Sequence, residues 1–174
     1  MNYSNIIQYD TANGPGIRTS LFVSGCKNHC VGCFNNEAHD FNCGTPFTDK
    51  TYKQIQEHLQ SPVVAGLSLL GGDPLWQNIY DITTLINLCQ YTHKLNKNVW
   101  LWTGFSWEDV IDLSDDSMEH IYRRALLREC DVVVDGPFIE SLKDLSLAWR
   151  GSSNQRIIDV QKSLEHHCAI RAQW

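Results

Sequence analysis

Three cysteines stand close together in the first part of the chain. Cys26, Cys30 and Cys33 form the pattern C-x3-C-x2-C. Thiolates at this spacing can converge on one metal centre, and iron–sulfur clusters are held by cysteine thiolates, usually four of them. Three cysteines would hold three corners of a four-iron cluster and leave the fourth iron open. An open coordination position separates a catalytic metal site from a structural one, so the spacing predicts a reactive metal centre.

A tetrahedral zinc site is the alternative that the spacing leaves open. Cys43, His29 or His39 would supply the fourth ligand. A third reading, three coincidental core cysteines, fits poorly because the segment is rich in Gly and Asn. The remaining cysteines form no second close-spaced group, and Cys89 and Cys130 fit small core residues at the ends of helical stretches. The sequence therefore predicts one metal site, not two.

A glycine-rich segment is the second candidate for ligand binding. It reads Gly71-Gly72-Asp73-Pro74 and follows a strongly apolar run. Paired glycines let the backbone come close to a ligand, and the Asp73 carboxylate suits charge-assisted hydrogen bonds from an ammonium group. The structural alternative is that Asp73 caps a helix with Pro74 at its first position. Both roles can hold at once, through different carboxylate oxygens.

These segments need strands and helices that bring them together. Apolar and β-branched runs predict strands at 19–24, 63–70, 98–102, 131–134 and 156–160. Helical periodicity predicts helices at 49–60, 79–95 and 118–129. Alternation of this kind predicts an α/β fold with a mainly parallel sheet, whose functional residues follow the carboxyl ends of the strands. The segment 25–43, called the cysteine loop below, lies at such a position.

Length and composition set further limits. The chain has 174 residues, 43% of them hydrophobic and 20% charged, which predicts one globular domain over residues 1–174. A complete eight-unit barrel typically needs about 250 residues. The net charge of −6 argues against a nucleic-acid partner, and no apolar run approaches the roughly 18 residues of a membrane span. Seven cysteines without a secretory signal favour a reducing compartment, the cytoplasm.

The cysteine loop resembles that of the radical S-adenosylmethionine (SAM) enzymes, where the same motif follows the first barrel strand. The resemblance implies that Cys26, Cys30 and Cys33 hold one [4Fe–4S] cluster whose fourth iron binds the amine and carboxylate of SAM. The reduced cluster of that family cleaves SAM to methionine and a 5′-deoxyadenosyl radical. The family's Gly-Gly-Glu-type segment, which binds the methionine amine, matches Gly71–Asp73 with Asp in place of Glu.

The resemblance also implies further SAM contacts. In the family an aromatic residue precedes the third cysteine and its backbone helps to hold the adenine; here Gly32 has that place and Phe34 follows Cys33. We therefore expect the backbone from Gly32 to Phe34 to line the adenine site. Thr103, at the carboxyl end of the third strand, is expected near the SAM ribose or sulfonium. Packing of Phe34 and burial of Thr103 are the structural alternatives.

Narrower segments resemble the glycyl-radical-enzyme activases. Asn13–Arg18 is similar to their D-G-P-G-x-R segment, with Asn13 replacing Asp. The late run Arg150–Asp159, RGSSNQRIID, is similar to the activases of anaerobic (class III) ribonucleoside-triphosphate reductase, as are Trp102–Phe105 and Asp135–Phe138. Activases of pyruvate formate-lyase share the front half of the signature and are the nearest alternative. Arg18 is expected to pair with a carboxylate or a partner, or to be solvated.

The implied activity is that of an oxidoreductase that forms a glycyl radical on the large subunit of the reductase. The implied electron donor is flavodoxin or a similar protein, and no catalytic side chain is required beyond the cluster and SAM. The implied fold is an incomplete, laterally open (β/α) barrel. A chain too short for a full barrel would leave its active site open to the partner's glycine from the side.

Overall fold

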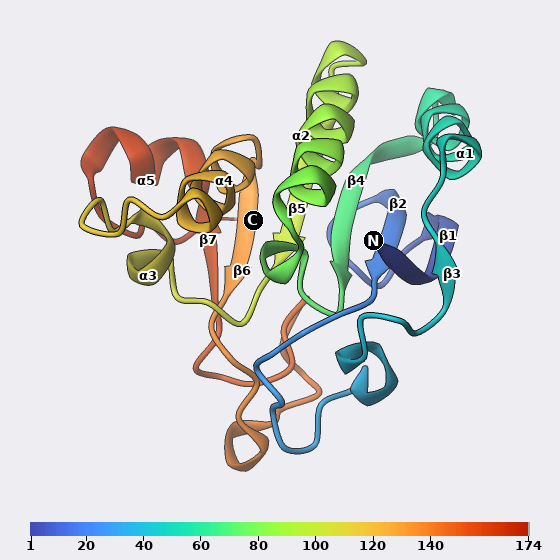
Figure 1. Cartoon of the computed structure of the whole chain (residues 1–174). Helices are drawn as coiled ribbons and strands as arrows, with labels where there is room; N and C mark the ends of the chain where they lie inside the picture. The colour runs from blue at the N-terminus through green and yellow to red at the C-terminus, as the bar shows by residue number, and fades with distance from the viewer. Residues whose placement is uncertain (174) are drawn as a thin grey trace.

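The computed structural model describes residues 1–173, so the last residue of the expected domain 1–174 lies outside the described part. The described chain forms one sheet with helices packed against it (Figure 1). The strands are β1 Asn2–Asp10, β2 Ile17–Val23, β3 Thr45–Pro46, β4 Val64–Gly71, β5 Asn98–Trp102, β6 Val132–Asp135 and β7 Arg156–Asp159. The α-helices are α1 Asp49–Gln60, α2 Ile79–Lys94, α3 Trp107–Ile111, α4 Met118–Arg128 and α5 Val160–His166. Short 3-10 turns are η1 Asn36–His39, η2 Pro74–Trp76 and η3 Glu140–Leu142.

The sheet is open and has seven strands in the order β3-β1-β2-β4-β5-β6-β7. Its centre is parallel, because β2 pairs with β4, β4 with β5 and β5 with β6 in the same direction. Both edges are antiparallel: β1 pairs with β2 and β3, and β7 pairs with β6. The α/β fold with a parallel centre is confirmed, while the sheet as a whole is mixed.

The expected elements are present with shifts of one or two residues at their ends. Helix α1 begins where the sequence predicts, because the Thr48 hydroxyl accepts a hydrogen bond from the backbone N–H of Thr51, and the Thr51 hydroxyl accepts one from the N–H of Thr48. Strand β7 was predicted as a strand, but its direction was not. The connection from β6 to β7 contains no α-helix, so nothing returns the chain to the start of β6 for a parallel pairing.

One face of the sheet forms the main hydrophobic core. All five α-helices contribute to this core, which they close against alternate residues of the strands, such as Leu21, Leu69, Leu101 and Val133. These four side chains are fully buried. Because side chains alternate across a strand, the positions between them point to the other face. None of the helices within residues 1–173 is long and apolar enough to cross a membrane.

The opposite face carries polar and aromatic groups. Arg18 on β2 is fully buried there, against the expectation of a solvated or partner-bound side chain. It donates to the Ser68 hydroxyl (2.6 Å), the Leu67 carbonyl (2.7 Å) and the Asn98 side chain (2.8 Å), and it lies over the Trp100 ring. Burial lowers the pKa of this guanidinium to about 10. Arg18 therefore connects β2, β4 and β5 on this face of the sheet.

Candidate functional site

The cysteine loop leaves β2 and is fastened at its stem. The backbone N–H of Gly25 donates to the carbonyl of Ala38 (2.8 Å), and that of Cys26 donates to the carbonyl of His39 (3.2 Å). Gly25 has a φ of +103° and its α-carbon lies against the Phe41 ring, where a side chain would collide. The paired segments Gly25–Cys26 and Ala38–His39, the stem of the cysteine loop, therefore hold the loop at the carboxyl end of β2.

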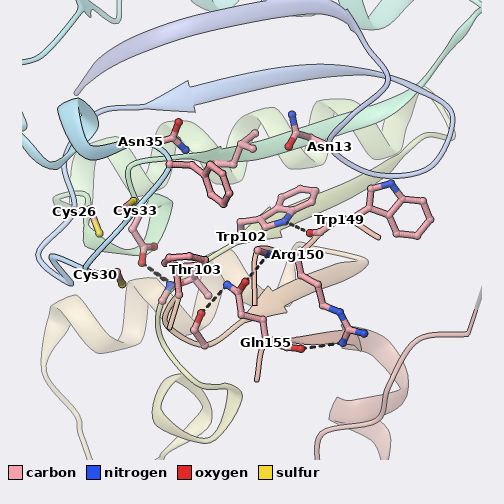
Figure 2. A pocket seen from close by; sticks show the side chains of 18 of the residues that line it. Asn13, Cys26, Cys30, Cys33, Asn35, Trp102, Thr103, Trp149, Arg150 and Gln155 are labelled. Carbon is pink, nitrogen blue, oxygen red and sulfur yellow. Dashed lines mark hydrogen bonds between the residues drawn. The ribbon is translucent and has the colours of Figure 1, made fainter. Parts of the chain in front are cut away.

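The three predicted ligands line one cavity of about 580 Å³ at the carboxyl ends of the strands (Figure 2). This volume falls within the roughly 300–1,000 Å³ of small-molecule sites. Cys26 is buried, while Cys30 and Cys33 are half-buried. Cys43 is not among the residues that line the cavity. The structure thus separates the three motif cysteines from the fourth cysteine of the same loop.

The three thiols line the cavity but are not grouped around a position for a single metal ion. Among residues 1–173, no three His, Cys, Asp or Glu side chains are in position to hold a metal ion. The zinc set is not formed there either, and the rings of His29 and His39 pack against each other with centroids 5.0 Å apart. Burial raises the pKa of the Cys26 thiol to about 12, and the charge of Asp73 adds to this effect. A cationic centre would reverse that shift, because bound metal deprotonates a coordinating thiol.

The donor set fits an iron–sulfur centre by its chemistry. Soft thiolates are the ligands that such clusters take, and three of them face a cavity large enough for a ligand beside them. Cys89 and Cys130 are fully buried in the main core, as the sequence predicts. They are thereby separated from the cavity, which leaves the motif cysteines as its sulfur donors within the described chain.

The Gly71–Gly72 turn packs the end of β4 directly onto the cysteine loop. Gly71 has a φ of +105°, and a side chain on Gly72 would lie 2.6 Å from the Gly25 carbonyl oxygen. The N–H of Gly72 donates to Val23 (2.7 Å), and the N–H of Asp73 donates to Gly25 (2.9 Å). These glycines are required for close approach of backbone to backbone. Both glycines also line the cavity.

Asp73 collects four hydrogen bonds. One carboxylate oxygen caps η2 by accepting from the N–H of Leu75 (3.0 Å), which is the predicted structural role. The other accepts from the hydroxyl of Thr103 (3.0 Å), the N–H of Gly104 (2.9 Å) and the side-chain amide of Asn28 (3.1 Å). Burial raises the pKa of Asp73 to about 6 although the four donors lower it. Two residues predicted separately, Asp73 and Thr103, are therefore one unit.

Gly32 and Phe34 are the two neighbours of Cys33 in the sequence, and only Phe34 lines the cavity. A side chain on Gly32 would meet the Glu140 carboxylate at 2.7 Å, and Gly32 is not among the cavity-lining residues. Phe34 lines the cavity and is 61% exposed. Its ring packs edge-on against Phe138 with centroids 5.6 Å apart. The cysteine loop therefore contacts the segment that follows β6.

That segment, residues 136–155, is called the late loop below and forms the other wall of the cavity (Figure 2). The Gln155 side chain holds it together: its amide oxygen accepts from the N–H of Gly151 (2.8 Å) and Ser152 (3.2 Å), and its amide nitrogen donates to the Gly136 carbonyl (3.0 Å). Gln155 belongs to the late run Arg150–Asp159, whose residues carry no individual role from sequence alone. The structure gives it contacts within the late loop and a place on the cavity wall.

Several cavity residues carried no prediction. Trp102 and Trp149 line the cavity, and the indole N–H of Trp102 donates to the Trp149 carbonyl (2.7 Å). Trp149 has a φ of +56°, which costs energy for a side chain of this size. Arg150 and Asn28 also line the cavity. Their proximity to β4 and β5 depends on tertiary structure, so only the position of Asn28 inside the cysteine motif could have marked it.

Comparison with known proteins agrees with this site. A family described as a 4Fe-4S single cluster domain matches residues 12–158. The chain is 39% identical to the anaerobic ribonucleoside-triphosphate reductase-activating protein of Enterobacteria phage T4, over 90% of this chain and 93% of that protein. It is 40% identical to the protein of the same name from Escherichia coli strain K12, over 89% and 96% of the two chains. The relative from Haemophilus influenzae is 38% identical over 90% and 97%. The chain therefore belongs to the family of anaerobic ribonucleoside-triphosphate reductase-activating proteins and carries that 4Fe-4S domain.

Proposed function

We propose that this chain activates an anaerobic ribonucleoside-triphosphate reductase by forming a glycyl radical on its large subunit. The observation that carries the proposal is the shared cavity: Cys26, Cys30 and Cys33 face it from one side, and the Asp73–Thr103 unit closes its end. We further propose that residues 1–174 form one radical SAM domain, and that the open sheet is an incomplete, laterally open barrel. The relatives' shared name and their coverage of nearly the whole chain support this assignment.

Cys26, Cys30 and Cys33 would hold the [4Fe–4S] cluster, and the rest of the cavity would hold SAM. A bound and reduced cluster would supply the electron for cleavage of SAM, and the resulting 5′-deoxyadenosyl radical would take the hydrogen atom from a glycine Cα. The cofactor carries the difficult chemistry, and the protein binds, orients and excludes water. No general acid or base is needed, so the absence of a catalytic side chain from the scheme is no objection.

The chain's own residues would orient SAM in distinct ways. Gly71 and Gly72 expose main-chain atoms to the cavity, where no side chain competes with a ligand. Asp73 contributes a negative charge at the cavity wall for the methionine ammonium, although both of its oxygens already accept hydrogen bonds. Phe34 and the backbone beside Cys33 would contact the adenine, and Thr103 the ribose or sulfonium region.

The partner would enter from the open side of the cavity. Phe34 and Leu145 line the cavity, yet they are 61% and 81% exposed. Exposed apolar residues beside a functional cavity are a common feature of interaction sites. We propose that the glycine-bearing segment of the reductase covers them, that flavodoxin or a similar protein donates the electron, and that the chain works in the cytoplasm. Its seven free cysteines fit a reducing compartment.

Electron paramagnetic resonance of the anaerobically reconstituted chain tests the proposal. A reduced cluster signal that changes on addition of SAM is the expected result, because SAM would bind the cluster directly. Mixing with the reductase, SAM and a reductant should then give a glycyl radical signal. A colourless chain that holds zinc alone would overturn the cluster in favour of a zinc-binding module. A radical formed only on pyruvate formate-lyase would reassign the partner.

A further inference from the structure

Asn28 occupies the middle of the cysteine motif, and its side chain points away from the loop toward the strand ends. The amide nitrogen donates to Asp73 (3.1 Å), and the amide oxygen accepts from the indole N–H of Trp76 (3.1 Å). Both partners lie directly after β4. The two ends of one short side chain therefore tie the cysteine loop to the end of the central strand.

The space around this amide leaves little freedom. A side chain on Gly104, directly after β5, would lie 2.0 Å from the amide nitrogen of Asn28. The N–H of Gly104 and the hydroxyl of Thr103 bind the same Asp73 oxygen that accepts from Asn28. Asn28 is thus wedged between the ends of β4 and β5. A residue with a side chain at position 104 would therefore displace the Asn28 amide.

The partner that donates to Asn28 is itself fixed. The Trp76 ring packs on the Phe105 ring with centroids 4.7 Å apart. The Arg123 guanidinium lies 4.7 Å from the Trp76 ring centre, and the Lys27 ammonium lies 5.2 Å from it. Cation–π contacts of this kind stabilise the ring. Trp76 therefore offers Asn28 a donor of defined position.

The backbone of Asn28 points to a sulfur. Its N–H donates to Sγ of Cys26 at 3.5 Å. Hydrogen bonds to cluster sulfurs raise the reduction potential of iron–sulfur centres, and groups that orient the ligands tune a metal site. The contacts of the Asn28 side chain with Asp73 and Trp76 therefore also fix the position of this N–H next to Cys26.

We propose that Asn28 is a positioning residue that fastens the cysteine loop to the ends of β4 and β5 and aims its N–H at the Cys26 sulfur. The proposal deepens the proposed function, since it takes Cys26 as a cluster ligand. Removal of the side chain releases the loop from Asp73 and Trp76 together. The cluster then loses a fixed hydrogen bond to one sulfur, so its midpoint potential falls.

Hydrogen exchange of the cluster-free chain tests the fastening alone. Asn28→Ala should speed amide exchange in residues 26–33 by at least about tenfold, because it removes a hydrogen bond to a charged group together with the bond to Trp76. Asn42→Ala is the matched control, because Asn42 lies in the same loop and its side chain bonds only to Asp40 in that loop. The bond from the Asn2 side chain goes to the backbone carbonyl of Asn42, which the substitution keeps. Unchanged exchange in Asn28→Ala would overturn the proposal, whether or not the chain holds a cluster.

The midpoint potential of the cluster in the reconstituted chain tests the hydrogen bond from the Asn28 N–H to the Cys26 sulfur. Asn28→Asp keeps an acceptor for Trp76 but sets a like charge against Asp73, so it should loosen the loop at least as much as Asn28→Ala. Both variants should shift the potential to more negative values, and Asn42→Ala should not. Faster exchange with an unchanged potential would reject the N–H···S part and leave a structural fastening. Failure to form any cluster in the wild-type chain would instead overturn the proposed function.

Discussion

The two loops that line the cavity are held in different ways (Figure 2). The cysteine loop is closed at its stem by the backbone bonds of Gly25 and Cys26, and at its middle Asn28 ties it to Asp73 beyond the loop. The late loop is held from within, by Gln155 and by the Asn154 side chain, which donates to the Pro137 carbonyl (2.8 Å). The cysteine loop thus has a side-chain tie to the strand ends at its middle. The late loop is closed mainly by its own side chains, with one further bond from the Trp102 indole to the Trp149 carbonyl.

This difference indicates how each loop serves the site. The cysteine loop carries the three candidate sulfur ligands, and metal binding is coupled to local folding. A loop closed by its own side chains keeps its shape whether the cavity is filled or not. Changes in the cysteine loop should therefore act on the cluster, and changes in the late loop should act on what binds beside it.

The largest expected effect comes from the motif cysteines. Cys26→Ala, Cys30→Ala and Cys33→Ala should each abolish the cluster and SAM cleavage, because three ligands leave no spare. Iron and sulfide content after anaerobic reconstitution measures the loss, together with the absorbance of the cluster.

Two other cysteines make matched controls for this comparison. Cys43→Ala changes the same loop outside the cavity, and Cys89→Ala changes a fully buried core position. Both should keep the cluster, while Cys89→Ala should lower the free energy of unfolding by about 1 kcal/mol. Loss of the cluster in Cys43→Ala would show that a fourth ligand comes from this loop, and the model with an open iron would be wrong.

A smaller effect is expected from Gln155 in the late loop. Gln155→Ala removes three hydrogen bonds that together close this wall. At about 1 kcal/mol each, the loss should weaken SAM binding by at most roughly 140-fold, with iron content unchanged. Equilibrium binding of SAM to the reconstituted chain measures this.

Gln161 offers the matched control for that change. It lies on α5, and its side chain donates to the carbonyls of Arg128 and Cys130, away from the cavity. Gln161→Ala should leave SAM binding as in the wild type. A Gln155→Ala chain that lost its cluster instead would mean that the two loops are not independent, contrary to the comparison.

The sequence predicted the helix-covered half of the fold well, because amphipathic periodicity and caps act locally. Thr48 marks the start of α1 by its own hydrogen bond. Strand β1, Asn2–Asp10, was missed because its residues are mostly exposed or half-buried, so it lacks an apolar run. Arg18 was misjudged for a related reason. Its partners on β4 and β5 are far away in sequence, and nothing local shows that an arginine is buried among them.

The site was predictable where its chemistry is concentrated in one short segment. The cysteine motif and the Gly71–Asp73 turn carry their own signals, and the cavity brings them together. The connections between segments were not predictable. The bonds from Asn28 and Thr103 to Asp73 join residues 45 and 30 positions apart. Pairings of that kind depend on the sheet register, which no single segment specifies.

The smallest expected effect comes from the ion pair at the base of the late loop. Arg156 binds both oxygens of Glu108 (2.7 and 3.1 Å) and also the buried carboxylate of Asp135. The hydrogen bonds from Arg156 lower the pKa of Glu108 below its usual 4.5. The contribution of the Glu108–Arg156 ion pair to the free energy of unfolding is therefore complete above about pH 4.5 and is lost as the pH falls through the folded-state pKa of Glu108.

Because Glu108 is exposed and Asp135 also holds Arg156, the expected loss is small. Glu108→Gln should lower the free energy of unfolding by at most about 1 kcal/mol near neutral pH, and the difference from wild type should vanish in acid. Urea unfolding across that pH range measures it, with Glu119→Gln on α4 as the control that removes the same charge. A loss that persisted in acid would come from packing rather than charge. A loss of several kcal/mol would show that the late loop depends on an external anchor, which would remove the contrast with the cysteine loop.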